Sequence, residues 1–289
     1  MSIFDTRNST TRILNTQRSV GLKKLPVNEG RDTESGLCAM GHNKVLIPDK
    51  PIFSVITVVK NGESCLEKTI CSVLEHQYSN VEYIVIDGGS SDNTLGIIKK
   101  YEDKIDYWIS EPDKGIYDAM NKGVLLSSND TFILFLNCGD LLFKLPVDTN
   151  LSHDNIYLGI VELATGSIFA NKVNYKLKLF NAIHHQSVLV SSKLMHKHLF
   201  DCSYKTYADF DLMQQFNINN YKFVTLNSLR VSTAPAGISN KFKFIEMTKI
   251  VFKNYGLLWY FLSIIYGLLF SVKKNTSYLI TKIHHITRY

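Results

Sequence analysis

Residues 53–87 read "FSVITVVKNGESCLEKTICSVLEHQYSNVEYIVID", and this stretch decides the fold class. It begins and ends with continuous runs rich in Val and Ile, a pattern typical of strands that are covered on both faces of a sheet. Between these runs, Leu66, Ile70 and Val73 recur at helical spacing. This spacing predicts a helix over about 63–76. A strand, a helix and a second strand of this kind predict a right-handed crossover between parallel strands.

The alternation continues beyond residue 87. Further strands are predicted at 105–110 and 131–137, with a helix between them. Strands that alternate with helices of about 10–15 residues are typical of parallel sheets built from crossover units. We therefore expect an α/β fold with a mostly parallel central sheet flanked by helices.

Polar clusters follow three of these strands. Asp87 ends one strand, 111–115 follows the next, and 137–140 follows the strand at 131–137. Turns favour Asp, Asn and Gly for structural reasons, so one such cluster alone says little about function. Ligands of open α/β sheets, however, bind beyond the carboxyl ends of the strands. Three clusters at this edge together predict a ligand site.

Length and composition are ordinary for a globular protein. The chain has 289 residues, 45% of them hydrophobic and 20% charged, which suits one large domain or two small ones. The five cysteines form no CxxC pair and are odd in number, which favours thiols in a reducing cytosol over a disulfide framework. The start, "MSIFDTRNSTTRILNTQRS", lacks the apolar core of a signal peptide, so no export signal is expected.

The pattern divides the chain into three parts. Residues 1–49 are polar and lack sustained periodicity, and we expect a flexible arm. Residues 50–240 are expected to form the folded domain, with halves at 50–145 and 146–240. Residues 241–289 are expected to form a basic and apolar helical tail.

The tail differs from the rest in charge and hydrophobicity. The chain has a net charge of +6, and residues 241–289 alone carry +7. Within them, 255–272 read "YGLLWYFLSIIYGLLFSV", 18 residues without a charge. A spanning helix needs about 20 residues, so we favour a helix that lies on the membrane surface, with a single spanning helix and a buried core helix as alternatives. An apolar run between the charges does not track phosphates, so no nucleic acid partner is expected.

Four motifs appear in unbroken order: "SVITVVKNGE", "VEYIVIDGGSSDNT", "EPDKGIYDAMNKG" and "FILFLNCGD". Together they closely resemble the nucleotide-binding half of inverting family-2 glycosyltransferases of the GT-A fold, above all bacterial enzymes that build surface polysaccharides. The likeness covers about residues 52–143, and a weaker one continues to about residue 240. It implies the GT-A fold of nucleotide-diphospho-sugar transferases.

The resemblance also implies a site for the nucleotide-sugar donor. The family's Asp at the place of Asp87 binds the base, and many members carry a second Asp where this chain has Gly88. A plain turn is the alternative. A dinucleotide-binding fold is disfavoured because "GGSSD" follows the second strand and lacks the GxGxxG spacing. The expected donor-binding residues are Val59, Asn61, Asp87, Gly89, Ser90, Asp113, Lys114, Gly115, Asn121 and Asn137.

"NCGD", residues 137–140, stands where the family has its metal-binding Asp-x-Asp. Asp140 keeps one of the two acids, and Asn137 replaces the other. Hard divalent cations prefer oxygen ligands and often bridge substrate phosphates. The resemblance therefore implies Mg²⁺ or Mn²⁺ at Asp140, held by a weaker protein cage than in the family, with a strand-end turn without metal as the alternative.

The catalytic base is expected in the second half, in "TYADFDLMQQF". Inverting transfer needs a group that takes the proton of the acceptor hydroxyl. Asp209 and Asp211 point about 200° apart on a helix, so one of them should face the site. The resemblance assigns the base to Asp209. Asp211 is placed on the acceptor side as a supporting residue, together with His185 and Gln186.

The resemblance thus implies an enzyme of the hexosyltransferase type. It would move a sugar from a nucleotide-diphosphate sugar to a hydroxyl of a glycan carried on a polyprenyl diphosphate, at the inner face of the plasma membrane. Residues 241–289 would attach it to the membrane surface. A sugar-nucleotidyltransferase is one alternative, although "VVKNGE" lacks the Gly-rich loop expected of it. A membrane-bound sugar-nucleotide binder with degraded chemistry is the other.

Overall fold

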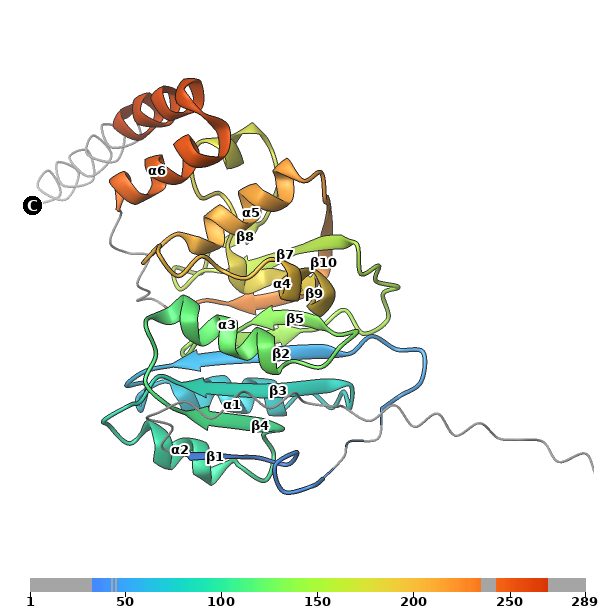
Figure 1. Ribbon diagram of the computed structural model, residues 1–289. Coiled ribbons are helices and arrows are strands. Elements are labelled where there is room, and N and C mark those ends of the chain that lie inside the picture. The colour runs from blue at the N-terminus through green and yellow to red at the C-terminus, as the bar shows by residue number, and fades with distance from the viewer. Residues whose placement is uncertain (1–32, 43, 45, 235–242, 270–289) are drawn as a thin grey trace, which may run out of the picture.

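The computed structural model describes residues 33–42, 44, 46–234 and 243–269, and in this part of the chain ten strands form one sheet (Figure 1). The strands are β1 (Thr33–Ser35), β2 (Phe53–Val59), β3 (Val81–Asp87), β4 (Tyr107–Ser110), β5 (Phe132–Phe135), β6 (Leu141–Lys144), β7 (Asn155–Glu162), β8 (Ile168–Ala170), β9 (Val188–Ser191) and β10 (Lys222–Ser232). The α-helices are α1 (Leu66–Leu74), α2 (Thr94–Lys100), α3 (Ile116–Leu126), α4 (Ser192–Lys197), α5 (Ala208–Ile218) and α6 (Phe244–Tyr255). Two short 3₁₀ helices are η1 (Tyr175–Lys178) and η2 (His185–Ser187).

The sheet is mixed, with the order β1-β4-β3-β2-β5-β9-β7-β10-β6 and β8 paired to β7. The prediction of an α/β fold is confirmed, and the predicted strands 53–59 and 81–87 are β2 and β3. A mostly parallel sheet describes only β4, β3, β2 and β5, which run parallel. Beyond β5, β9 pairs antiparallel with both β5 and β7. In this part of the sheet, β7 and β10 are the pair that runs parallel. Helical crossovers, which parallel pairing requires, connect the strands of the N-terminal half of the domain. The alternation of strands and helices seen in the sequence belongs to this half.

Two hydrophobic cores cover the two faces of the sheet. Alternate residues of β2 explain the unbroken apolar run, because Ile56 and Val58 enter one core while Phe53 and Val55 enter the other. The first core is completed by α3, α4, α5 and α6, and the second by α1 and α2. The carboxyl ends of β2, β3 and β5 are thereby held between helical layers.

The boundary of the polar N-terminal arm needs a correction. β1 pairs antiparallel with β4, so Thr33–Ser35 belong to the sheet and not to a flexible arm. Farther along, the Lys44 ammonium lies 2.6 Å from a carboxylate oxygen of Asp106, a residue that is 1% exposed. These long-range contacts involve a polar segment with no periodicity, and local sequence patterns do not reveal them. The rest of the predicted arm, 1–32, lies outside the described residues.

The C-terminal part of the described chain is not one helix from 255 onward. α6 ends at Tyr255, Gly256 interrupts the helix, and residues 257–269 form a second helical segment. Residues 270–272 of the predicted apolar helix lie outside the described residues. Among the residues that the structure describes, no helix has both the length and the apolar character needed to cross a bilayer.

A polar cluster joins α6 to α5. Asn254 Nδ2 donates a hydrogen bond to Asp211 Oδ1 at 2.8 Å, and Lys253 Nζ lies 3.4 Å from Asp211 Oδ2. Gln215 Nε2 donates to Asn254 Oδ1 at 2.7 Å. Asp211 is 5% exposed, so its charge depends on these partners.

We predict that Asp211→Ala destabilises the protein through the loss of this cluster. The free energy of unfolding should fall by about 1.5–3 kcal/mol, the range for a hydrogen bond to a charged group. Chemical denaturation measures the change, with Asp148→Ala, whose side chain is 85% exposed, as the matched control. Equal effects of the two substitutions would contradict this role for Asp211.

Candidate active site

Two adjoining cavities lie at the carboxyl ends of β2 and β5. The first, which we name the β2 cavity, has a volume of about 700 Å³ and is lined by the end of β2, the start of α3 and the turn after β5. The second, the α5 cavity, has a volume of about 640 Å³ and is lined by residues of α3, α5, α6 and the segment 169–186. Both cavities share Ile116, Asn137, His184 and Gln186 as lining residues. Of the three predicted polar clusters, 111–115 and 137–140 supply lining residues to the β2 cavity, whereas Asp87 does not.

The turn after β3 is locked by Asp87. Its Oδ1 accepts a hydrogen bond from Ser90 Oγ at 2.5 Å, and its Oδ2 accepts one from Ser110 Oγ at 2.6 Å. Asp87 is fully buried and does not line either cavity. Its carboxylate therefore fixes the turn that contains Gly89 and Ser90, where the sequence had suggested direct contact with a base.

Asn61 links this turn to the end of β2. Its backbone N–H donates to Ser90 Oγ at 2.7 Å, and its Oδ1 accepts from the backbone N–H of Ser91 at 2.8 Å. Asn61 and Val59 both line the β2 cavity. The Asp87 turn thus acts on the cavity indirectly, by positioning the wall made of these two residues.

Gly88 makes room for Asp113. A Cβ at Gly88 would lie 2.0 Å from Asp113 Oδ2, so the second Asp that many family members carry does not fit beside this rotamer. Asp113 lines the β2 cavity, and its Oδ1 accepts a hydrogen bond from the backbone N–H of Gly115 at 3.0 Å. A carboxylate therefore remains at the cavity, supplied by Asp113 in place of residue 88.

The amino end of α3 contributes to the cavity wall. Gly115 lies directly before the helix with φ of 129°, a conformation that side chains other than hydrogen rarely adopt, and it lines the β2 cavity. The 11-residue helix α3 thus begins at the cavity, where its backbone dipole favours an anion.

Besides Asp87, Gly89 and Ser90, two further predicted donor residues, Lys114 and Asn121, lie outside the lining of the β2 cavity. Asn121 Nδ2 donates to the carbonyl oxygen of Phe200 at 2.9 Å, and Asn121 Oδ1 accepts from the Phe200 backbone N–H at 2.9 Å. Neither Asn121 nor Lys114 lines the β2 cavity. The prediction of a donor contact for Asn121 is therefore corrected: its side chain holds the segment before α5 in place. Its position in a helix alone did not reveal this contact.

The turn after β5 presents two oxygen atoms without a partner. Asp140 Oδ1 accepts from the backbone N–H of Ala234 at 2.9 Å, whereas Asp140 Oδ2 is buried and has no hydrogen-bond partner among the described residues. The same holds for Asn137 Oδ1. Burial raises the pKa of Asp140 to about 6, and the bond from Ala234 opposes this rise. Buried acceptors of this kind call for a ligand.

A donor set for a divalent cation is therefore present but small. Carboxylate and amide oxygens are the ligands that Mg²⁺ and Mn²⁺ prefer. Within the described residues, no group of three or more His, Cys, Asp or Glu side chains is arranged to hold a metal ion. Asp140 and Asn137 fit a cation that takes its remaining ligands from phosphate and water.

His185 joins the two cavities through a chain of hydrogen bonds. Its Nδ1 lies 2.9 Å from Asp209 Oδ2, and its Nε2 lies 3.2 Å from Asn137 Nδ2. Asp209 Oδ1 is also 3.0 Å from the Tyr117 hydroxyl, and Asn181 Nδ2 is 3.5 Å from Oδ2. Both oxygens of Asp209 are thus engaged, and the imidazole bridges from α5 to the turn after β5.

The two groups of this pair stabilise each other's charged forms. Burial alone would raise the pKa of Asp209, but hydrogen bonds from His185 and Tyr117 outweigh it and hold the pKa below its usual range. Burial lowers the pKa of His185, but the hydrogen bond to Asp209 and its charge outweigh this effect, so the pKa lies above its usual range. The Asp209 carboxylate holds one ring nitrogen of His185, and the Asn137 amide contacts the other.

The acceptor-side predictions divide between two places. His185, Gln186 and Asp209 line the α5 cavity, as predicted for one common site. Asp211 is corrected: it does not line the cavity, because it points to α6 and bonds Asn254. This outcome follows the helical geometry that places residues 209 and 211 on different faces.

Several lining residues escaped the sequence analysis. Tyr117 was not among the predicted site residues, yet its hydroxyl contacts Asp209. Lys172, Lys176 and Lys205 line the α5 cavity but lie in loops or in the short helix η1, where no period marks them. All five cysteines are free, as predicted, and the Sγ atoms of Cys65 and Cys138 lie 2.8 Å apart at the β2 cavity.

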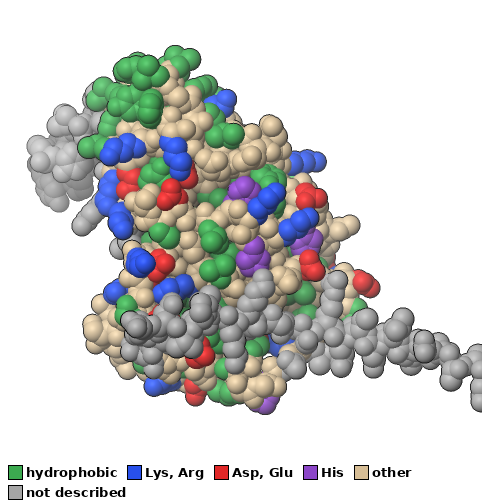
Figure 2. All heavy atoms as spheres, in the orientation of Figure 1, with side chains coloured by type: hydrophobic (Ala, Val, Ile, Leu, Met, Phe, Trp, Pro, Cys, Tyr) green, Lys and Arg blue, Asp and Glu red, His purple; other side chains and the backbone are tan. Residues whose placement is uncertain are grey.

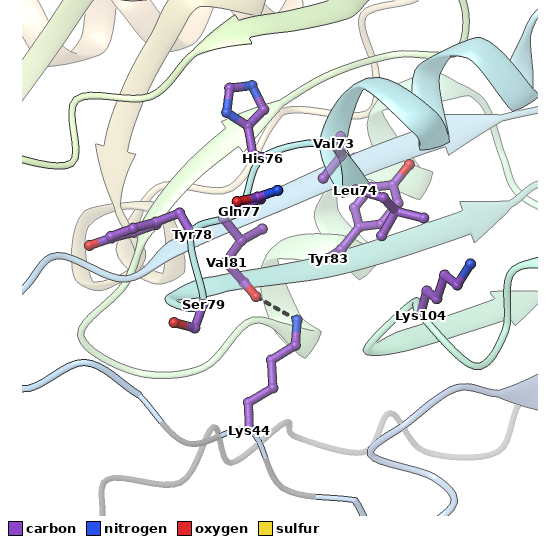
Figure 3. Close-up of a pocket in the computed structure, with 10 residues that line it drawn as sticks. All are labelled: Lys44, Val73, Leu74, His76, Gln77, Tyr78, Ser79, Val81, Tyr83 and Lys104. Atoms are coloured by element: carbon purple, nitrogen blue, oxygen red, sulfur yellow. Dashed lines mark hydrogen bonds between the residues drawn. The ribbon is translucent and has the colours of Figure 1, made fainter.

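A third hollow lies apart from this site. It has a volume of about 290 Å³ and is lined by the end of α1, the start of β3 and Lys44, whose Nζ donates to the Val81 carbonyl oxygen at 2.8 Å (Figure 3). It opens at the amino end of β3, the edge opposite to the two cavities. None of the predicted site residues lines it.

Comparison with known proteins gives a partial match in sequence. Residues 54–143 match the model of the family described as Glycosyl transferase family 2. An uncharacterized glycosyltransferase of Mycobacterium tuberculosis is 43% identical over 91 residues, 31% of this chain and 34% of its own. A PGL/p-HBAD biosynthesis glycosyltransferase of Mycobacterium bovis is 30% identical over 132 residues, 44% of this chain and 50% of its own. The chain thus spans half or less of the length of these two relatives.

Solved structures share the fold. S. aureus TarS 1-349, in complex with UDP-GlcNAc, superposes with a TM-score of 0.53 at 16% identity, covering 69% of this chain and 65% of its own. A mannosyltransferase of Pyrobaculum calidifontis, in complex with GDP-Man and Mn²⁺, gives 0.52 at 14% identity, covering 73% and 66%. At these identities the likeness concerns the fold alone. The chain therefore carries a glycosyl transferase family 2 region, residues 54–143, within a GT-A fold.

Proposed function

We propose that this protein is an inverting glycosyltransferase that moves a sugar from a nucleotide-diphosphate sugar to a hydroxyl of a glycan acceptor. The observation that carries the proposal is the junction of the two cavities at Asn137, beside the hydrogen-bonded pair His185 and Asp209. Donor and acceptor held on the two sides of this junction would meet there. The family match over 54–143 supports the reaction class.

The β2 cavity is the proposed donor site. Asn61 and Asp113 offer hydrogen-bonding groups at its wall, and the amino end of α3 favours the diphosphate. The relatives in fold that bind UDP-GlcNAc and GDP-Man support a nucleotide-sugar ligand. Asp87 and Ser90 do not line this cavity, and their hydrogen bond fixes the turn that supports its wall.

The oxygens of Asp140 and Asn137 would hold Mg²⁺ or Mn²⁺, which supplies positive charge to the departing diphosphate. The structure in complex with GDP-Man and Mn²⁺ supports this assignment. Because the protein offers a single carboxylate here, we expect the cation to bind weakly until the donor adds its phosphate oxygens.

The proton of the acceptor hydroxyl would pass to the pair formed by His185 and Asp209. Asp209 is the predicted base, but both of its oxygens already accept hydrogen bonds. His185 Nε2, which lies 3.2 Å from the Asn137 amide, would take the proton once the acceptor hydroxyl replaces that amide as its partner, and Asp209 would stabilise the imidazolium that results. The acceptor oxygen then forms its bond to the anomeric carbon while the bond from that carbon to the diphosphate breaks, which inverts the centre.

The acceptor is proposed to be a lipid-linked glycan of bacterial surface polysaccharide synthesis, reached from the inner face of the plasma membrane. Figure 2 shows hydrophobic side chains gathered at the end of the molecule formed by α6 and 257–269. Exposed side chains there include Leu258 at 70%, Ile265 at 54% and Leu269 at 65%. An apolar face of this size beside the lysines of α6 fits a helix that lies in the headgroup zone.

A sugar-nucleotide binder without turnover is the second candidate. The observation in its favour is Asn137 in place of an acid, which leaves Asp140 as the one carboxylate of the turn after β5. Turnover measurements on the variants below separate the two candidates.

We predict that Asp209→Asn and His185→Gln each lower kcat by about 10²–10⁴-fold, the usual contribution of a general base. Donor affinity, measured by thermal shift with a panel of nucleotide sugars and Mn²⁺, should stay unchanged, because neither side chain lines the β2 cavity. His198→Gln and Asp201→Asn, outside both cavities, serve as controls. Full activity in His185→Gln would remove the imidazole from proton transfer, and donor binding without turnover in the unaltered protein would favour the binder.

We predict that Asp140→Ala removes the gain in donor affinity that Mn²⁺ provides. The expected loss is about tenfold or more, since a lost charge-assisted contact is worth about 1.5–3 kcal/mol. Titration with and without Mn²⁺ measures it, with Asp148→Ala as the remote control. If Mn²⁺ strengthens donor binding equally in both variants, the cation lies elsewhere.

We predict that Leu258→Glu weakens binding to vesicles that contain anionic phospholipid by about 10–100-fold, because burial of a Leu side chain stabilises by about 1.5–3 kcal/mol. Vesicle co-sedimentation measures the change. Leu125→Glu in α3, where Leu125 is 40% exposed, should bind as the unaltered protein does. Unchanged sedimentation of the Leu258→Glu protein would exclude this face as the membrane contact.

A further inference from the structure

The α5 cavity is unusually basic for a site that contains a catalytic carboxylate. Lys172 and Lys176 line it from the segment 169–186 and Lys205 from the residues before α5, and none of the three forms an ion pair with another described residue. Asp209 is the one acidic lining residue, and its charge is already shared with His185. The lining thus carries an excess of positive charge toward whatever enters.

We propose that Lys172, Lys176 and Lys205 form a subsite for a phosphate or diphosphate group carried by the acceptor. Ammonium groups around one cavity repel each other, and an anion that binds among them relieves this repulsion. Lysine binds phosphate oxygens through short, charge-assisted hydrogen bonds. The inference rests on the proposed function only in that it names the ligand as the acceptor; the anion site itself does not depend on transfer.

The surroundings of the cavity favour an anion attached to an apolar chain. Phe180 lines the cavity and stacks on Tyr266 of the segment 257–269, with ring centroids 4.7 Å apart and planes 7° apart. Met247 of α6 also lines the cavity. The same two helical segments carry the exposed apolar face (Figure 2). A lipid tail on that face would place its phosphate group near the lysines.

Two amide side chains add hydrogen-bonding capacity on the same wall. Asn174 and Asn181 line the α5 cavity, and Asn181 Nδ2 lies 3.5 Å from Asp209 Oδ2. A sugar that contacts Asn181 would therefore lie beside the pair His185 and Asp209. In this arrangement the phosphate fixes the acceptor at one end and the reacting hydroxyl lies at the other, which orients the substrate before transfer.

Binding of simple probes tests the subsite without turnover. Farnesyl diphosphate, inorganic pyrophosphate and farnesol are titrated by calorimetry in EDTA, so that no cation draws a diphosphate into the β2 cavity. The triple variant Lys172→Gln, Lys176→Gln, Lys205→Gln is compared with Lys99→Gln, Lys144→Gln, Lys222→Gln, three exposed lysines outside the cavity. Both triples lose the same net charge, so general attraction of anions cancels.

The first triple should lose at least about 100-fold in affinity for farnesyl diphosphate, at about tenfold for each phosphate contact, while the second keeps its affinity. Tighter binding of farnesyl diphosphate than of pyrophosphate would identify a lipid-borne phosphate. Equal binding of the two would identify a water-soluble phosphorylated acceptor at the same lysines. Equal losses in the two triples, or farnesol binding as well as farnesyl diphosphate, would overturn the subsite. A failure of glycosyl transfer in any assay leaves these binding results untouched, so the two proposals can fail separately.

Discussion

The hydrogen bond between His185 Nδ1 and Asp209 Oδ2 ties together parts of the chain that are otherwise far apart. Asp209 comes from α5, His185 from η2, and Asn137 on the other side of the imidazole comes from the turn after β5. The two cavities meet where this bond lies. Without it, the link that His185 makes between the turn after β5 and helix α5 would be lost, and a buried carboxylate would lose a partner that keeps it charged.

The rest of the site is arranged around this link in two chemical environments. The β2 cavity offers backbone amides, a helix amino terminus and oxygen atoms without partners at Asp140 and Asn137. The α5 cavity offers lysines and an apolar boundary that continues into α6 and 257–269. The first suits a phosphorylated nucleotide with a cation, and the second suits an amphiphilic acceptor. The two cavities thus differ in charge and hydrophobicity, as two different substrates would require.

Sequence patterns predicted the parts of this arrangement that depend on local periodicity. β2 and β3 were found because both faces of these strands are buried. Helical geometry indicated that only one of Asp209 and Asp211 faces the site, and the family resemblance named Asp209. The strand-end location of Asp140 followed from the order of strands. These features need no knowledge of distant contacts.

The features that were missed depend on contacts between distant segments. The pairing of β1 with β4 involves a polar segment without a period. Asn121 fastens Phe200, 79 residues away, so its position in α3 does not disclose its role. Asp87 was expected at the ligand, but hydrogen bonds from Ser90 and Ser110 turn it inward. Lys205 of the α5 cavity is brought beside Lys172 and Lys176 by the fold and not by a local sequence pattern.

The most direct test of this account is a crystal structure with a bound nucleotide-diphosphate sugar and Mn²⁺. The account predicts the nucleotide between Asn61 and Asp113, the diphosphate at Asp140, and the anomeric carbon at Asn137 with its open side toward His185 Nε2. A donor whose sugar points away from His185, or one that occupies the α5 cavity, would contradict it.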